Sequence, residues 1–162
     1  VNCRYVNRSI SGSCSTDHEQ LRQMGRYDEL AYVNLIYYGV GANDAGYSVP
    51  IDTTNANLDA LIAWKKKFWS NAVLVLEGPP PLQLDIVETK AAAIRASMLS
   101  KVEAAADPKI KYFNAGTAFD RTVNSYYASS DPIGQGVHLS DTGHGAWYAA
   151  RKTWYENSPW TF

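Results

Sequence analysis

The sequence contains few of the residues that build metal sites and disulfides, with two cysteines, two methionines and three histidines among 162 residues. Charged residues are also sparse, at 19%, and their charges nearly cancel to a net charge of -1. So balanced a chain lacks the basic surface that nucleic-acid binding needs. No stretch approaches the roughly 20 apolar residues that a membrane-spanning helix requires. These shortages argue against a nucleic-acid partner and against a membrane span.

The two cysteines, Cys3 and Cys14, do not indicate a disulfide. If residues 3–8 form an extended strand, at about 3.3 Å per residue, the two sulfur atoms lie too far apart to bond unless the loop folds back. Neither cysteine has a histidine at the spacing of a zinc site. We therefore expect free thiols and no metal site.

Apolar residues make up 46% of the chain, which is enough to build the core of one domain over residues 1–162. The chain begins at Val1 with neither a signal peptide nor an initiator methionine. We therefore expect it to be part of a longer polypeptide.

Apolar runs alternate with helical patterns along the chain, which is typical of a parallel sheet covered by helices on both faces. We predict strands near 3–8, 32–38, 72–77 and 110–114, and helices near 16–25, 55–69, 84–106 and 141–156.

The second apolar run ends in Gly41-Ala42-Asn43-Asp44. Loops at the carboxyl ends of parallel strands are where α/β sheets place their chemistry. Glycine allows a sharp turn, and the Asn43 amide can donate a hydrogen bond to an oxygen that gains negative charge. The same residues also fit an ordinary turn.

Two further segments, Tyr5 to Thr16 and Gln135 to His144, lie in a particular order around this loop. Together the three resemble the SGNH (GDSL-like) hydrolases, a family of serine esterases and lipases. The resemblance implies a flavodoxin-like α/β/α fold with a parallel sheet, and it makes Gly12 and Asn43 oxyanion donors and His138 the general base. It also places the proline segment 78–81 beside the site, and its chemistry needs no cofactor.

The nucleophile of that family is missing, because no Gly-Asp-Ser occurs in the sequence. Ser11, Ser13 and Ser15 lie beside Gly12, but a loop that holds the oxyanion does not itself attack. The family's first strand, which ends in the nucleophile, is central in the sheet order 2-1-3-4-5. We therefore expect no nucleophile in this chain, and we expect a companion N-terminal segment to supply both the serine and the missing strand.

Two residues are candidates for orienting His138. Gln135 stands where the family has an acid, three residues earlier, and Asp131 could replace that acid. Asp141 and His144 form a second Asp-x-x-His pattern, but the resemblance places His144 at the start of a helix, where a surface or capping role is expected. For His18, near the start of the first helix, we expect exposure to solvent.

The resemblance implies hydrolysis of a carboxylic ester, with a small ester or an acetylated carbohydrate as substrate. The alternative is a catalytically inactive relative that binds glycans or proteins. The absent nucleophile and the neutral Gln135 favour that alternative, whereas the presence together of Gly12, Asn43 and His138 favours the enzyme.

Overall fold

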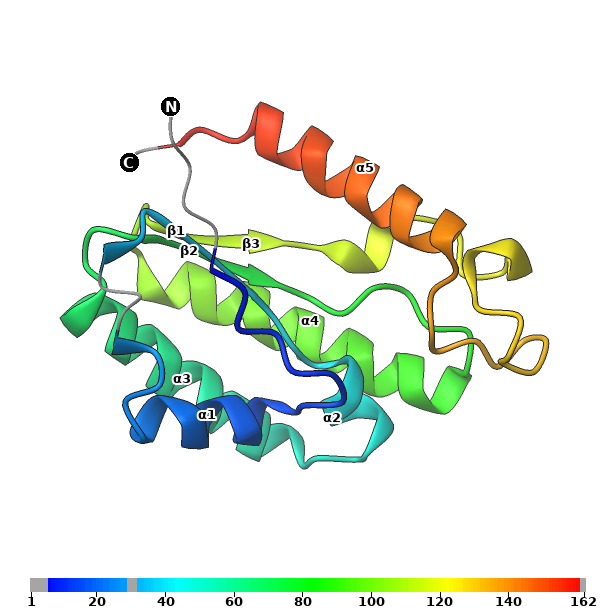
Figure 1. Ribbon diagram of the computed structural model, residues 1–162, viewed down its shortest axis with the longest axis horizontal. Helices are drawn as coiled ribbons and strands as arrows, with labels where there is room; N and C mark the ends of the chain where they lie inside the picture. Colours follow the sequence, from blue (N-terminus) through cyan, green and yellow to red (C-terminus); the bar gives the residue numbers. More distant parts are fainter. Residues whose placement is uncertain (1–5, 29–31, 161–162) are drawn as a thin grey trace.

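The computed structural model describes residues 6–28 and 32–160 (Figure 1). Its centre is a parallel sheet of three strands, β1 (Leu35–Gly39), β2 (Val73–Glu77) and β3 (Ile110–Phe113). The strands lie in the order β1-β2-β3, with Tyr37 opposite Val75 and Val75 opposite Lys111. All three were predicted, although β1 begins three residues later than the apolar run suggested.

The strand predicted over 3–8 is not confirmed. Residues 6–8 have no strand structure, and residues 3–5 lie outside the described part of the chain. No backbone hydrogen bond joins residues 6–10 to β1 within the described residues. An extended segment becomes a strand only when it pairs with a neighbour that satisfies its ladder donors and acceptors, and residues 6–8 make no such pairing in the described residues.

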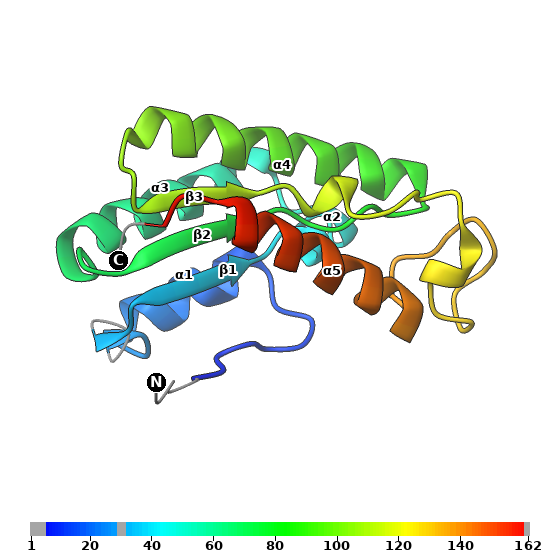
Figure 2. The same cartoon turned by 90° about the horizontal axis from the view of Figure 1, so that it is seen from above.

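Helices cover both faces of the sheet, as predicted, and the chain is α/β with three layers. Helices α1 (Ser15–Gln23), α3 (Ile51–Phe68) and α4 (Asp85–Ala105) lie below the sheet in Figure 1, and α5 (Asp141–Asn157) lies above it. Figure 2 shows the same layers from above.

The central strand β2 explains this layering, because all five of its residues are buried. Successive side chains of a strand point to opposite faces. Leu74 and Leu76 pack in the core with α3 and α4, whereas Val73 and Val75 pack against the α5 side. A strand buried on both faces is apolar at every position, which is why it was readable from the sequence.

Helix ends follow local capping chemistry. Helix α3 begins at Ile51, four residues before its predicted start, with Pro50 at the N-cap, where a missing N–H removes no intrahelical hydrogen bond. At the start of α5 the Ser140 hydroxyl accepts a hydrogen bond from the Gly143 N–H at 3.1 Å.

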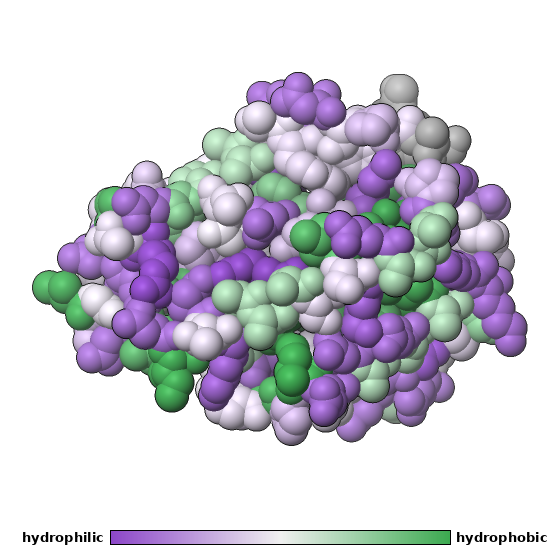
Figure 3. Space-filling model, turned by 180° about the vertical axis from the view of Figure 1, so that it is seen from behind, coloured by the Kyte–Doolittle hydropathy of each residue, from purple (hydrophilic) through white to green (hydrophobic). Residues whose placement is uncertain are grey.

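The structure also bears on the thiols, metal sites and membrane spans considered in the sequence. Cys14 is a free, buried thiol, and Cys3 lies outside the described residues. Among residues 6–28 and 32–160, no cluster of three histidine, cysteine or acidic side chains could hold a metal ion. Within the same ranges, every helix is too short or too polar to span a membrane. On the face shown in Figure 3, exposed apolar side chains are scattered among polar ones.

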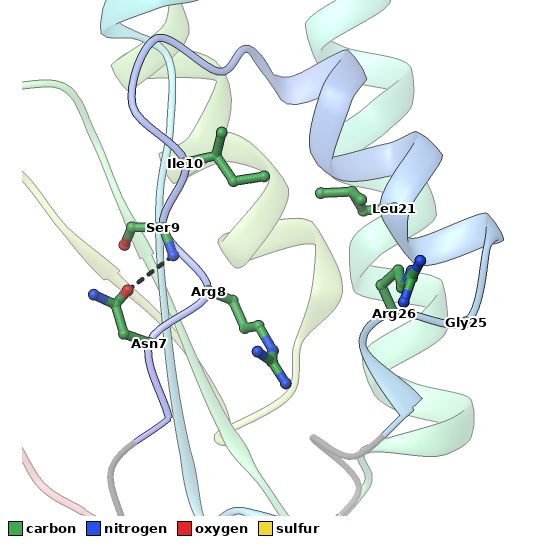
Figure 4. Close-up of a pocket in the computed structure, with 7 residues that line it drawn as sticks. All are labelled: Asn7, Arg8, Ser9, Ile10, Leu21, Gly25 and Arg26. Carbon is green, nitrogen blue, oxygen red and sulfur yellow. Dashed lines mark hydrogen bonds between the residues drawn. The ribbon is translucent and has the colours of Figure 1, made fainter.

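The edge of β1 that faces away from β2 is open in the described residues. Residues 7–10 run along this side of the molecule, and a pocket separates them from Leu21, Gly25 and Arg26 (Figure 4). Asn7 folds over this segment, with its Oδ1 accepting the Ser9 N–H at 2.8 Å. On this side the described sheet therefore ends at β1.

Candidate functional site

Four short structures follow the ends of the strands. Helix α2 (Ala42–Gly46) follows β1, the buried proline segment 78–81 follows β2, and two 3-10 helices follow β3. The second of these, η3 (Asn124–Tyr126), leads to the loop before α5. In Figure 1 the strands point toward α2 and this loop. The segments singled out in the sequence thus lie at the same end of the sheet, beyond the carboxyl ends of its strands.

Gly41 is required at the turn from β1 into α2. Its φ is 112°, in the left-handed region that side chains disfavour. A Cβ added there would lie 2.9 Å from Ile94 Cγ2 and 3.3 Å from Pro79 Cδ. Glycine therefore lets the loop turn while packed against α4 and the proline segment.

Asn43 and the Gly12 loop are held together. The Asn43 Nδ2 donates a hydrogen bond to the Ser13 carbonyl oxygen at 3.0 Å, across 30 residues of sequence. Gly12 is exposed, with a φ of 77°. A side-chain amide nitrogen carries two hydrogens, so one orients Asn43 and the second is available for a bound oxygen. The two predicted oxyanion donors are neighbours.

Below these donors lies a buried polar network centred on Asp44, whose side chain is fully buried. Its carboxylate accepts hydrogen bonds from the Ser15 N–H at 3.0 Å, the Ser15 hydroxyl at 2.5 Å and the Thr54 hydroxyl at 3.0 Å. These bonds join α2 to the start of α1 and to α3. The burial of Ser15 removes it as a nucleophile.

His138 lies in the exposed loop before α5, and Asp131 orients it. The His138 Nδ1 and the Asp131 Oδ1 are 2.9 Å apart, with the His138 side chain 75% exposed and that of Asp131 9% exposed. The other carboxylate oxygen, Oδ2, accepts the backbone N–H groups of Val137 and His138, each at 2.8 Å. Because an ionised carboxylate only accepts, this contact assigns the hydrogen to Nδ1 and leaves Nε2 able to accept a proton.

The protonation of Asp131 fits this role. Burial acts to raise its pKa, but hydrogen bonds from the backbone and ring of His138 and from the Val137 N–H together lower the pKa below its ordinary value. Asp131 is therefore ionised at neutral pH, and its negative charge accepts hydrogen bonds from Val137 and His138 in the same loop.

The other candidates lie elsewhere. Gln135 is exposed; its backbone N–H donates to the Pro132 carbonyl at 2.9 Å, and in the described residues its side chain makes no bond to His138. Asp141 and His144 are exposed on the first turn of α5, and the His144 ring stacks on Trp147 with centroids 6.1 Å apart. His144 is thus a helix-surface residue, as expected.

His18 is not simply solvated, so that expectation was wrong. Its Nε2 lies 2.8 Å from the Ser13 Oγ, its Nδ1 lies 2.5 Å from the Tyr27 hydroxyl, and its ring meets Tyr38 edge-on. Burial lowers the pKa of the ring against the opposing effect of Asp17 and Asp44. The Ser13 Oγ also donates to the Ile10 carbonyl at 2.8 Å. That bond uses the hydroxyl hydrogen, so His18 fastens the Gly12 loop to α1 by donating to Ser13.

The proline segment connects the part of the site that carries Gly12 and Asn43 with the loop that carries His138. It packs against Gly41 on one side, and on the other side it leads into Gln83, which bonds to Gly136 in the His138 loop. Every backbone carbonyl from residue 79 to residue 82 accepts a side-chain hydrogen bond. The donors are Arg95 for Pro79 and Pro80, Tyr127 for Pro81 and Arg121 for Leu82.

The sequence named Asp131 beside Gln135 as a possible partner of His138 without choosing between them, and Gln83 was not named at all. A residue that bonds to a loop 53 positions away has no local signature. The run of three prolines was the available signal, because it marks a stiff segment whose carbonyls need partners when buried.

A model of the GDSL-like lipase/acylhydrolase family matches residues 2–146. No curated protein matches the sequence.

Solved structures share the fold at low sequence identity. A catalytic mutant of an acetylxylan esterase from Geobacillus stearothermophilus superposes with a TM-score of 0.70 at 16% identity, covering 97% of this chain and 74% of that one. An aryl esterase from M. smegmatis gives a TM-score of 0.61 at 16% identity, covering 91% and 76%. An extracellular lipase from Streptomyces rimosus gives 0.53 at 14% identity, covering 89% and 77%.

Proposed function

Because this chain belongs to the GDSL-like lipase/acylhydrolase family, we propose that it supplies the general base and the oxyanion hole of a carboxylic-ester hydrolase. The observation that carries the proposal is the pairing of His138 with the ionised Asp131, which leaves Nε2 free to take a proton. Asn43, held against the loop of Gly12, supports it from the other side of the site.

The proposed reaction has two halves. A serine hydroxyl attacks the ester carbonyl as its proton passes to His138 Nε2, and the carbonyl oxygen becomes an oxyanion held by the Gly12 N–H and the Asn43 amide. When the carbon–oxygen bond to the alcohol breaks, His138 returns the proton to the leaving oxygen. Water then repeats the sequence on the acyl-enzyme and releases the carboxylic acid.

We propose that the serine comes from a segment outside these 162 residues. The sequence contains no Gly-Asp-Ser, and in the described residues the edge of β1 away from β2 has no partner strand. A pocket also lies between residues 7–10 and the segment from Leu21 to Arg26. A strand added along β1 would pair with its unpaired backbone groups and would end near Gly12 and Asn43.

For the substrate we propose a small ester, with acetyl groups on a carbohydrate as the first class to test. This proposal is supported by two structural neighbours, which are named as an acetylxylan esterase and an aryl esterase.

The test is hydrolysis of p-nitrophenyl acetate, with intact mass measured before and after treatment with a serine-directed fluorophosphonate. The proposal predicts hydrolysis, an adduct on a serine outside this sequence, and a rate loss of about 10²–10³-fold in Asn43→Ala. An adduct on Ser13, or full activity in Asn43→Ala, would contradict it.

The second candidate is the inactive relative that binds glycans or proteins, which the absent Gly-Asp-Ser favours. Absence of both hydrolysis and adduct in the folded protein would support this candidate instead.

A further inference from the structure

We propose that Gln83 is a positioning residue for His138, acting through Gly136. The proposal rests on the proposed function in one respect only: it takes His138 as the group whose place matters. Gln83 follows the proline segment and is 9% exposed, and Gly136 is buried two residues before His138.

Gln83 uses both backbone groups of Gly136. The Gln83 backbone N–H donates to the Gly136 carbonyl oxygen at 2.8 Å, and the Gly136 N–H donates to the Gln83 Oε1 at 3.1 Å. One residue thus bonds to Gly136 at two points, which fixes both the position and the rotation of that peptide segment. A single bond would leave the segment free to rotate about it.

The Gln83 amide has only one orientation that satisfies its partners. A backbone N–H can only donate, so the atom facing Gly136 is the oxygen. The Nε2 then faces Asn124, whose Oδ1 accepts it at 2.8 Å. Gln83 therefore connects the loop of His138 to η3 as well as to the proline segment.

Tyr127 joins the two ends of the loop that carries His138. Tyr127 forms an isolated antiparallel bridge with Leu139, and its hydroxyl donates to the Pro81 carbonyl at 3.0 Å. A Cβ on Gly136 would lie 2.3 Å from the Tyr127 Cγ, so Gly136 lies flat against this ring. The loop is anchored twice on the same rigid segment, through Tyr127 and through Gln83.

Such anchoring matters because the His138 ring has little packing of its own. With its side chain 75% exposed, the ring's direction is set by Asp131, and Asp131 belongs to the same loop. Asp131 orients the ring only while the backbone from Gly136 to His138 keeps its place, because the same carboxylate also accepts the Val137 and His138 N–H groups. The pair also cannot place the loop relative to Gly12 and Asn43. A displacement of about 1 Å in a catalytic group can cost on the order of 10²-fold in rate.

The test compares Gln83→Met with Gln83→Glu in the full chain. Methionine removes both side-chain bonds at similar volume. Glutamate keeps an acceptor for the Gly136 N–H, and the Asn124 amide can turn to donate to the second oxygen. Gln20→Met is the matched control, because Gln20 is exposed on α1.

The first readout is the nitrogen NMR spectrum of the imidazole rings, which is legible because the chain has three histidines. We expect the His138 signals alone to move toward a mixture of tautomers in Gln83→Met and to stay in place in Gln83→Glu and Gln20→Met. Unchanged His138 signals in a folded Gln83→Met would overturn the inference. This readout needs no activity, so it decides the inference even if the proposed function fails.

The second readout is ester hydrolysis. In Gln83→Met we expect kcat to fall about tenfold with KM within twofold, and Gln83→Glu to recover most of the loss. Equal losses in both variants would contradict a positioning role.

If Gln83→Met does not fold, Asn124→Ala replaces it, because Asn124 is exposed and its loss frees one side of the Gln83 amide. A smaller shift of the His138 signals is then expected, and no shift would overturn the inference.

Discussion

The two halves of the candidate site are built in opposite ways. The half that carries Gly12 and Asn43 lies above a buried network in which the Asp44 carboxylate joins three helices. The half that carries His138 is an exposed loop wound around Asp131 and attached to the proline segment. In the first half the proposed donors lie directly beside the residues that stabilise the fold. In the second half we expect activity and stability to be separable, because the His138 side chain itself is exposed.

The largest effect is expected at the exposed half, where activity should be lost without any loss of stability. His138→Ala removes the proton acceptor and should lower ester hydrolysis by about 10²–10⁴-fold. Because the side chain is 75% exposed, the melting temperature should stay the same. His144→Ala, another exposed histidine, is the control and should behave as the unchanged protein. A large fall in melting temperature would show that the halves are not separable.

The next effect separates the two orienting candidates. Asp131→Asn removes the charge that fixes the His138 tautomer, and we expect a loss on the order of 10²-fold in kcat/KM. Gln135→Ala should change it less than twofold, because the Gln135 side chain is exposed and makes no bond to His138 in the described residues. Steady-state kinetics of both variants decide between them. A larger loss of kcat/KM in Gln135→Ala than in Asp131→Asn would mean that Gln135 orients His138.

Asp131 also predicts a pH dependence of the loop. Its pKa is lowered in the folded protein, so the bonds it accepts are fully present above its ordinary carboxyl pKa, about 3.9. They are lost as the pH falls through the folded value. Amide exchange of the Val137 and His138 N–H groups should therefore quicken only below about pH 4. Loss of this protection already between pH 6 and pH 4 would contradict the contact.

At the buried half we expect stability to fall together with activity. Asp44→Asn leaves at least one donor of Ser15 or Thr54 unsatisfied, which costs about 3 kcal/mol of unfolding free energy. Urea unfolding measures it, and Asp52→Asn, at an exposed position in the first turn of α3, is the matched control. A stable Asp44→Asn would mean that the network is not what holds Asn43.

The smallest effect is expected at His18. Burial lowers its pKa, so the unfolded chain binds the proton more readily and stability falls as the pH drops below about 6.5 toward the folded pKa. Thermal unfolding between pH 7.5 and pH 5 should show this slope in the unchanged protein and a flatter one in His18→Asn. Identical slopes would mean that His18 does not titrate on unfolding.

The sequence was sufficient wherever a local pattern carried the information. The strands β2 and β3 and the helices near 84–106 and 141–156 follow from apolar periodicity, because a covered strand or helix face must be apolar. Gly12, Asn43 and His138 were named from short motifs, and the structure places all three at the carboxyl edge of the sheet. Their roles as donors and base remain predictions.

The tertiary structure decided which distant residues meet. Gln83 and Gly136, Asp44 and Ser15, and Arg95 and the proline carbonyls are paired by the way helices and loops close over the sheet, and such pairings leave no spacing in the sequence. The choice of Asp131 over Gln135 was likewise conformational, because the loop folds back and brings the residue seven positions away within bonding distance. Composition and periodicity fix which faces are buried, whereas hydrogen-bond partners are fixed only when the backbone has closed around them.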